Sequence, residues 1–204
     1  MCNRSCLDFA KFNLKPEDVR GKKIIEIGSR DVNGSVKQEI MPLQPLSYLG
    51  VDIEMADGVD EVCNVYDLVE HFGEESFDVV ISTEMVEHVR DWREAFSQMK
   101  RILKPNGVML ITTRSKGFPY HDYPSDFWRF ELEDMETIFS DMEIEALDND
   151  ESDPGVLVKA RKPVSFKEKS FEDFALYSMI TSKRSKDISS LDMLLFKVKG
   201  IFSR

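Results

Sequence analysis

The apolar residues of the chain fall into short runs separated by stretches of helical period. Short apolar runs bounded by glycine, proline or charged residues predict buried strands. The strands predicted in this way are 23–27, 46–52, 61–64, 77–82 and 108–112. Stretches in which apolar residues share one helical face predict helices. These helices are 7–14, 33–41, 92–103 and 133–139. Strands alternating with helices indicate an α/β fold with a mostly parallel sheet.

The pattern changes after the last of these helices. Two further apolar runs, 142–147 and 156–160, are separated by a polar turn and not by a helix. We therefore expect them to form an antiparallel hairpin at one edge of the sheet.

The segment 165–204 differs in charge from the rest of the chain. Its eight basic and five acidic residues give it a charge of +3, whereas the preceding residues sum to −14. Its apolar residues predict an amphipathic helix through Leu191, Leu194, Leu195, Val198 and Phe202. We expect a domain at 1–164 and a basic amphipathic helical tail at 165–204. The tail would pack on that domain or on a second copy in a homo-oligomer, with attachment to a membrane surface as the alternative.

Composition narrows the class of protein. The 204 residues suit one domain with a modest appendage, and 27 basic against 38 acidic residues give a net charge of −11. Such an excess of acid argues against a broad basic face for nucleic acid. The three cysteines lack metal-ligand spacing and indicate reduced thiols. No secretory signal is visible, and no run approaches the roughly 18 apolar residues of a membrane span. We expect a cytoplasmic protein without a transmembrane segment.

Two residues point to an adenosine-type cofactor. Gly28 directly follows the first predicted strand, where the lack of a Cβ allows a ligand to approach the backbone. Asp52 ends the second strand 24 residues later, close to the spacing at which an acid binds ribose hydroxyls. Arg30 replaces the second glycine of the dinucleotide fingerprint, which weakens a pyrophosphate interpretation. Both a nicotinamide cofactor and S-adenosylmethionine remain open at this point.

Four ordered blocks carry a family resemblance. They are IIEIGSRDVNGS at 24–35, YLGVDI at 48–53, SFDVVISTEMVEHV at 76–89 and ILKPNGVMLITT at 102–113. With these blocks the chain resembles class I S-adenosylmethionine-dependent methyltransferases of the methyltransferase domain 11/23 type, over roughly residues 20–162. A fifth block, FPYHDYPSDFWRF, resembles a subgroup linked to surface polysaccharides. The resemblance implies a Rossmann-like, mostly parallel seven-stranded sheet with an antiparallel C-terminal hairpin and helices on both faces.

The resemblance also implies a set of cofactor-binding residues. Glu26 would face the amino acid end of S-adenosylmethionine, Asp52 would hold the ribose hydroxyls, and Ile53 would pack against adenine. Asn64 stands where the family usually has Asp, and its carbonyl oxygen can still accept a hydrogen bond. The full implied set is Glu26, Gly28, Ser29, Arg30, Gly34, Asp52, Ile53, Asn64, Val65, Ser82 and Thr83.

Catalytic and acceptor-binding candidates follow the fourth and fifth strands. His88 and His121 are the candidates for a general base, because both follow strands that end at the expected pocket. Arg114, Tyr120 and Arg129 belong to an aromatic and basic loop that suits a glycosylated or phosphorylated acceptor. The alternative is that rings of this loop fill the core.

A metal site is an alternative that the sequence leaves open. Glu84, Glu87 and His88 would share one face of a helix and could bind a divalent cation together with His121. The same pattern resembles both metal-dependent and metal-independent methyltransferases, and we expect no metal here.

We therefore expect an enzyme that uses S-adenosylmethionine to methylate an oxygen of a small-molecule acceptor, which could carry a sugar. A nicotinamide-dependent oxidoreductase would share Gly28 and Asp52 but is disfavoured by Arg30. A non-catalytic protein that only binds the cofactor is the other alternative.

Overall fold

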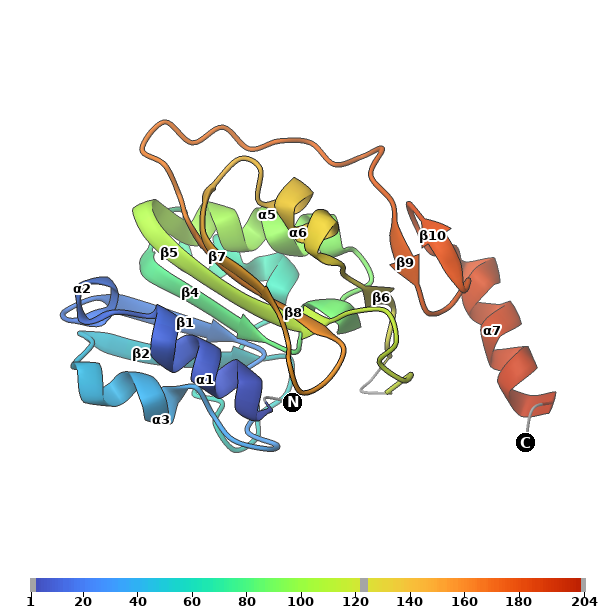
Figure 1. The fold of residues 1–204 in the computed structure, drawn as a ribbon, viewed down its shortest axis with the longest axis horizontal. Helices are drawn as coiled ribbons and strands as arrows, with labels where there is room; N and C mark the ends of the chain where they lie inside the picture. Colours follow the sequence, from blue (N-terminus) through green and yellow to red (C-terminus); the bar gives the residue numbers. More distant parts are fainter. Residues whose placement is uncertain (1–2, 122–124, 203–204) are drawn as a thin grey trace.

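The computed structural model describes residues 3–121 and 125–202, and its main element is a seven-stranded sheet in the order β3-β2-β1-β4-β5-β8-β7 (Figure 1). Its strands are β1 Lys23–Ile27, β2 Ser47–Asp52, β3 Glu61–Val62, β4 Phe77–Thr83, β5 Leu103–Arg114, β7 Glu143–Asn149 and β8 Gly155–Arg161. The α-helices are α1 Arg4–Asn13, α2 Pro16–Val19, α3 Lys37–Ile40, α4 Leu68–Phe72, α5 Trp92–Ile102, α6 Leu132–Ile138 and α7 Ser190–Phe202. Short 3₁₀ turns are η1 Met41–Leu43, η2 Val65–Asp67 and η3 Val86–His88.

The sheet is parallel from β3 to β5 and antiparallel at β8 and β7. The predicted fold class, including the C-terminal hairpin, is therefore confirmed. Since β1 pairs with both β2 and β4, the strand order reverses between β1 and β4. In open α/β sheets a ligand crevice lies outside the carboxyl ends of the strands at such a switch point.

Alternating side chains of the central strands supply two separate hydrophobic cores. Ile25 and Val80 belong to the larger core, which α5 and α6 cover, while Ile24 and Val79 belong to the smaller core beneath α1 and α3. Figure 1 shows these helices on opposite sides of the sheet. Both faces are thus buried, which explains why the central strands read as continuous apolar runs.

Two predicted elements differ from the structure. The predicted helix 33–41 shrinks to α3 because Gly34 has a φ of 121° and donates its N–H to the Asp31 carboxylate at 2.9 Å, which holds the chain in a turn. The strand predicted at 108–112 begins earlier, at Leu103, so residues 105–107 lie inside β5. Asn106 there has a φ of 62°, and the pairing of β4 with β5 shifts register.

The segment that precedes α7 packs on the main domain. A second sheet pairs β6 (Trp128–Arg129) with β9 (Leu176–Ser178), and β9 with β10 (Lys183–Ser185). Leu176, Ile180 and Ile188 are buried in the larger core. The predicted helical tail is therefore helical only from Ser190 onward, and its earlier residues form strands and loops.

α7 extends away from the sheet (Figure 1). Leu191, Leu194, Leu195 and Val198 are exposed, and the side chain of Phe202 lies outside the described part of the chain. Met193 and Phe196 pack against the larger core. Among the described residues, no helix is long and apolar enough to cross a membrane.

Candidate functional site

The loop after β1 is held tightly at the switch point. The N–H groups of Gly28 and Ser29 both donate to the Val51 carbonyl, at 2.9 and 3.1 Å. Gly28 has a φ of 77°, and a Cβ added there would lie 2.6 Å from Cγ of Met85. Only glycine allows the backbone of this loop to lie so close to Met85, at the place where a switch-point crevice is expected.

Asp52 lies beside this loop at the end of β2. Its carboxylate accepts the N–H of Ile53 at 2.7 Å and the N–H of Arg30 at 3.4 Å. Asp52 is only half-buried and Ile53 is exposed, so both remain accessible from the crevice. Ser29 is buried, and its Oγ has no hydrogen-bond partner in the described structure.

Polar residues lie further down the central strands. Glu26 is buried on β1 and accepts a hydrogen bond from the Tyr48 hydroxyl at 2.7 Å. Burial raises the pKa of Glu26 to about 7, and the Tyr48 hydrogen bond opposes this only in part. Ser82 donates to the Ile27 carbonyl at 2.9 Å, and Thr83 is buried beside it on β4.

Asn64 and Val65 follow β3. Asn64 is exposed, and its side-chain oxygen caps η2 by accepting the Tyr66 N–H at 3.1 Å. Val65 is buried in the larger core. A carbonyl oxygen has two lone pairs, so this cap leaves Asn64 one acceptor position.

Together these residues fit a nucleoside cofactor that lacks a pyrophosphate. The fit rests on the close approach at Gly28, the accessible Asp52 carboxylate and the unpartnered Ser29 hydroxyl. The cofactor roles assigned to individual residues stay predictions.

A second group of polar side chains lies beyond the end of β4. His88 and His121 meet with their ring centroids 4.7 Å apart. Oε1 of Glu87 lies 3.9 Å from Nε2 of His88 and 3.7 Å from Nε2 of His121. The Thr113 hydroxyl donates to Oε2 of Glu87 at 2.8 Å. The two predicted catalytic histidines thus lie side by side, although 33 positions separate them in the chain.

Each ring has a second contact that fixes its orientation. Nδ1 of His88 lies 2.7 Å from the Ser125 carbonyl and donates to it, and Nδ1 of His121 lies 3.1 Å from Oδ2 of Asp126. Burial lowers the pKa of His121, but the carboxylates of Asp126 and Glu87 outweigh it and raise that pKa to about 9.

Met85 connects this group to the cofactor crevice. Its side chain packs against Gly28, and its carbonyl accepts the N–H of His88 at 2.9 Å. His88 therefore follows Met85 within one turn, and His121 reaches the same place from the loop after β5. Sequence reasoning missed Met85, since a methionine after a strand carries no signal for such a contact.

The prediction that Glu84 shares a helical face with Glu87 and His88 is wrong. Glu84 has a φ of 54°, and η3 begins only at Val86, so Glu84 lies outside the helical turn. The Glu84 side chain instead pairs with Arg114 and accepts the Thr112 hydroxyl at 3.1 Å.

The three predicted acceptor-binding residues differ in accessibility. Arg114 is buried, pairs with Glu84 and lies 3.5 Å from Asp150. Arg129 is fully buried and binds both oxygens of Asp126, at 2.5 and 2.6 Å. Tyr120 is 39% exposed. Trp128 and Phe130 are fully buried, as the core interpretation of this loop predicts for such rings.

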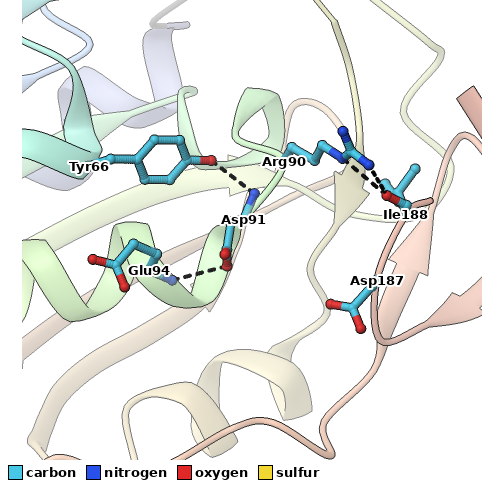
Figure 2. Close-up of a pocket in the computed structure, with 6 residues that line it drawn as sticks. All are labelled: Tyr66, Arg90, Asp91, Glu94, Asp187 and Ile188. Carbon is cyan, nitrogen blue, oxygen red and sulfur yellow. Dashed lines mark hydrogen bonds between the residues drawn. The ribbon is translucent and has the colours of Figure 1, made fainter. Parts of the chain in front are cut away.

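A cavity of about 510 Å³ opens where the segment before α7 crosses the start of α5 (Figure 2). Its lining residues are Tyr66, Arg90, Asp91, Glu94, Asp187 and Ile188. Figure 2 shows Arg90 donating to the Ile188 carbonyl, and the Nε contact is 3.0 Å. None of the predicted site residues lines this cavity.

Comparisons with curated proteins give two partial matches. The chain is 41% identical over 51 residues to phosphoethanolamine N-methyltransferase 2 of Caenorhabditis elegans. It is 30% identical over 118 residues to the mitochondrial ubiquinone biosynthesis O-methyltransferase of Homo sapiens. These matches cover 25% and 47% of this chain, but only 12% and 30% of the relatives.

Solved structures share the fold. One is 1,6-didemethyltoxoflavin-N1-methyltransferase of Burkholderia thailandensis, with bound S-adenosylhomocysteine. It has a TM-score of 0.60 at 13% identity over 77% of this chain and 78% of that one. Another is a putative methyltransferase in complex with the Haloferax volcanii Trm112 activator. It has a TM-score of 0.61 at 15% identity over 78% and 89%.

A family model described as a methyltransferase domain matches residues 3–149, more than half of the chain. This match agrees with the strand order, with its switch point between β1 and β4, and with the sequence blocks from which the resemblance was inferred. The chain belongs to the methyltransferase domain family and has the fold of class I S-adenosylmethionine-dependent methyltransferases.

Proposed function

We propose that the protein transfers a methyl group from S-adenosylmethionine to an oxygen of a small acceptor. The observation that carries this proposal is the pairing of His88 with His121, because His88 directly follows the turn at Met85, which packs against Gly28. S-adenosylmethionine supplies a methyl group on a sulfonium. During transfer the carbon–sulfur bond breaks as a carbon–oxygen bond forms.

The chain's own residues have two tasks in such a transfer. The loop at Gly28 and the Asp52 carboxylate would hold the donor, and Nε2 of His88 would accept the proton of the acceptor hydroxyl. His121, whose pKa is raised to about 9, would carry a proton beside it and act in positioning the acceptor. Fixed positioning of two reactants supplies much of the rate enhancement in reactions of this kind. A hydroxyl needs deprotonation because its neutral oxygen is a weak nucleophile.

The nature of the acceptor follows from the surroundings of the histidines. Tyr120 is 39% exposed one residue before His121, and its ring contacts that of Phe196 with the centroids 5.3 Å apart, so an acceptor sugar would add to an existing aromatic contact. Arg114 and Arg129 are occupied by buried carboxylates, so we do not assign them to an anionic group of the acceptor. Of the two curated relatives, the human protein is named as an O-methyltransferase and the Caenorhabditis elegans protein as an N-methyltransferase, so the choice of oxygen rests on the histidines and is tested against amine acceptors below.

Isothermal titration with S-adenosylhomocysteine, beside NADH, tests the cofactor. We expect micromolar binding of S-adenosylhomocysteine and none of NADH. Asp52→Ala should weaken binding at least tenfold. Glu54→Ala removes an exposed acid two residues away and serves as the matched control. Equal affinity of both variants would refute the assignment of Asp52, and binding of NADH alone would revive the oxidoreductase alternative.

Turnover tests the reaction. Methyl transfer from isotope-labelled S-adenosylmethionine should be measured against matched panels of small hydroxyl and amine acceptors. We expect product only with hydroxyl acceptors, and a loss of turnover in His88→Ala without loss of S-adenosylhomocysteine binding. Cofactor binding without turnover on either panel would favour the non-catalytic alternative.

A further inference from the structure

Three ligand atoms converge beyond the end of β4. Glu87, His88 and His121 each offer one potential metal ligand, and these atoms lie within 4.8 Å of one another. Glu87 and His88 come from η3, whereas His121 comes from the loop that follows β5. The fold therefore brings together two imidazoles and one carboxylate from separate segments, and this combination suits divalent transition ions.

Each ligand is oriented by another group. The Ser125 carbonyl receives Nδ1–H of His88, and the Asp126 carboxylate lies beside Nδ1 of His121. These contacts leave Nε2 of both rings facing Oε1 of Glu87, at 3.9 and 3.7 Å. Metal-binding histidines usually contact a carbonyl or carboxylate through their other ring nitrogen in this way.

Asp126 is itself fixed by Arg129, through two contacts of 2.5 and 2.6 Å. The oxygen of Glu87 that is not used for binding, Oε2, accepts the Thr113 hydroxyl at 2.8 Å. All three ligands thus have rigid support, which a metal site requires.

A second observation that supports a metal site is the burial of Oε1 of Glu87. Glu87 is 0% exposed, and its Oε1 has no hydrogen-bond partner among the described residues. A buried carboxylate oxygen without a partner is costly, and native structures rarely keep one without a purpose. This oxygen faces the two Nε2 atoms, where a cation would satisfy all three groups.

We propose that Glu87, His88 and His121 bind one divalent transition ion, with open coordination positions toward the acceptor. Two imidazole nitrogens and one carboxylate oxygen suit Mn²⁺, Fe²⁺ or Zn²⁺ better than Mg²⁺. Glu84 is not part of the site because Arg114 holds it elsewhere.

The proposal deepens the function proposed above, on which the role of the ion rests. A bound cation lowers the pKa of a coordinated hydroxyl, whose proton then passes to water, and it fixes the oxygen for attack. His88 and His121 would then act as ligands, and neither would serve as the general base. A proton on His121 competes with the ion, as for any imidazole ligand.

The test uses Mn²⁺ on the full chain after treatment with EDTA and dialysis. Nuclear magnetic resonance of the imidazoles is well suited, since the chain contains only three histidines. His71 is an internal control, because it lies near an exposed Glu61 and away from the cluster. We expect sub-stoichiometric Mn²⁺ to broaden the signals of His88 and His121 and to spare that of His71. Parallel broadening of all three signals would overturn the proposal.

Variants connect the broadening to the ligands. His88→Ala and Glu87→Gln should each weaken Mn²⁺ binding at least tenfold, while His71→Ala should not. Asp126→Asn should weaken it by about 10- to 100-fold, as loss of a supporting contact does in known metal sites. Unchanged Mn²⁺ affinity in folded His88→Ala protein would contradict the assignment.

Titration with S-adenosylhomocysteine in EDTA keeps the two proposals separate. Normal cofactor binding and full turnover in EDTA would refute the metal site and leave the methyltransferase function intact. Loss of turnover in EDTA, restored by Mn²⁺ in the wild type but not in His88→Ala, would support it. Failure to bind S-adenosylhomocysteine would refute the proposed function, whatever the result with Mn²⁺.

Discussion

Substitution of Gly28 by alanine tests the geometry of the cofactor loop. The new Cβ would lie 2.6 Å from Cγ and 2.7 Å from Cβ of Met85, closer than van der Waals contact allows. A φ of 77° adds backbone strain, because side chains rarely adopt the left-handed region. Both effects act where the switch-point crevice is expected, so stability and cofactor affinity should fall together.

The magnitude follows from a matched control. Gly21 has a similar φ of 69°, but an added Cβ meets nothing within 4 Å. Gly21→Ala should therefore cost only the left-handed term, about 1–2 kcal/mol of unfolding free energy. Gly28→Ala carries the same term plus overpacking of about 1–3 kcal/mol, which gives roughly 2–5 kcal/mol in all.

Urea unfolding measures this difference directly. Both tryptophans, Trp92 and Trp128, are fully buried, and their fluorescence should report the transition. In a Met85→Gly background the cost of Gly28→Ala should fall by about 1–3 kcal/mol, because both clashing atoms are then absent.

Titration with S-adenosylhomocysteine completes the test. Gly28→Ala should bind it at least tenfold more weakly than Gly21→Ala does. Equal unfolding free energies for the two alanine variants, with no coupling to Met85 beyond about 0.5 kcal/mol, would refute the close approach.

Three further predictions concern stability. The pKa of Glu26 is raised to about 7 in the folded protein. The contribution of this group to the free energy of unfolding is therefore complete below about pH 4.5 and is lost as the pH rises through 7. Thermal unfolding should therefore show Glu26→Gln to be more stable than the wild type at pH 8, by up to about 3 kcal/mol, but not at pH 4. Lys100→Met should lower the free energy of unfolding in urea by about 3–5 kcal/mol, because it leaves the buried Asp141 carboxylate, 2.7 Å from Lys100 Nζ, without its cation. Unfolding of Lys100→Met at the wild-type urea concentration would contradict a stabilising role for this ion pair. Leu176→Ala should cost about 2–5 kcal/mol, and Leu194→Ser less than about 0.5 kcal/mol, because only Leu176 is buried. Similar costs for these two variants would show that the segment before α7 is not part of the core.

The sheet could be predicted from the sequence because its strands are buried on both faces. β1 and β4 are continuous apolar runs that end at Gly28 and Thr83, and their predicted bounds agree with the structure to within one residue. The apolar period of α5 likewise predicted which face of the helix is buried, and Trp92, Phe96 and Met99 on that face are buried in the structure. Where burial restricts positions to apolar residues, the pattern of apolar residues predicts the element.

Other features depend on single residues or on contacts between distant segments. Glu84 lies outside the helical turn because its own backbone is left-handed, and one such residue does not change the apolar period of the sequence. β6 and β9 pair through two residues each, and 48 or more positions separate those residues in the chain. Pairing of this kind depends on tertiary context, which a local pattern does not contain.

Arg114 and Arg129 both lie in buried ion pairs near the ends of β4 and β5. Four carboxylates are buried near the ends of β4 and β5, those of Glu84, Glu87, Asp126 and Asp150. In an acidic chain the nearest arginines neutralise such groups: Arg114 pairs with Glu84 and Asp150, and Arg129 pairs with Asp126.

Glu87 is the exception among these four. In the part of the chain that the structure describes, neither arginine nor lysine pairs with it, and its charged contacts are the imidazoles of His88 and His121. A buried charge without a permanent cation is costly. Because the pKa of His121 is raised to about 9, a proton on that imidazole balances Glu87 near neutral pH, and the proposed ion would have to displace this proton.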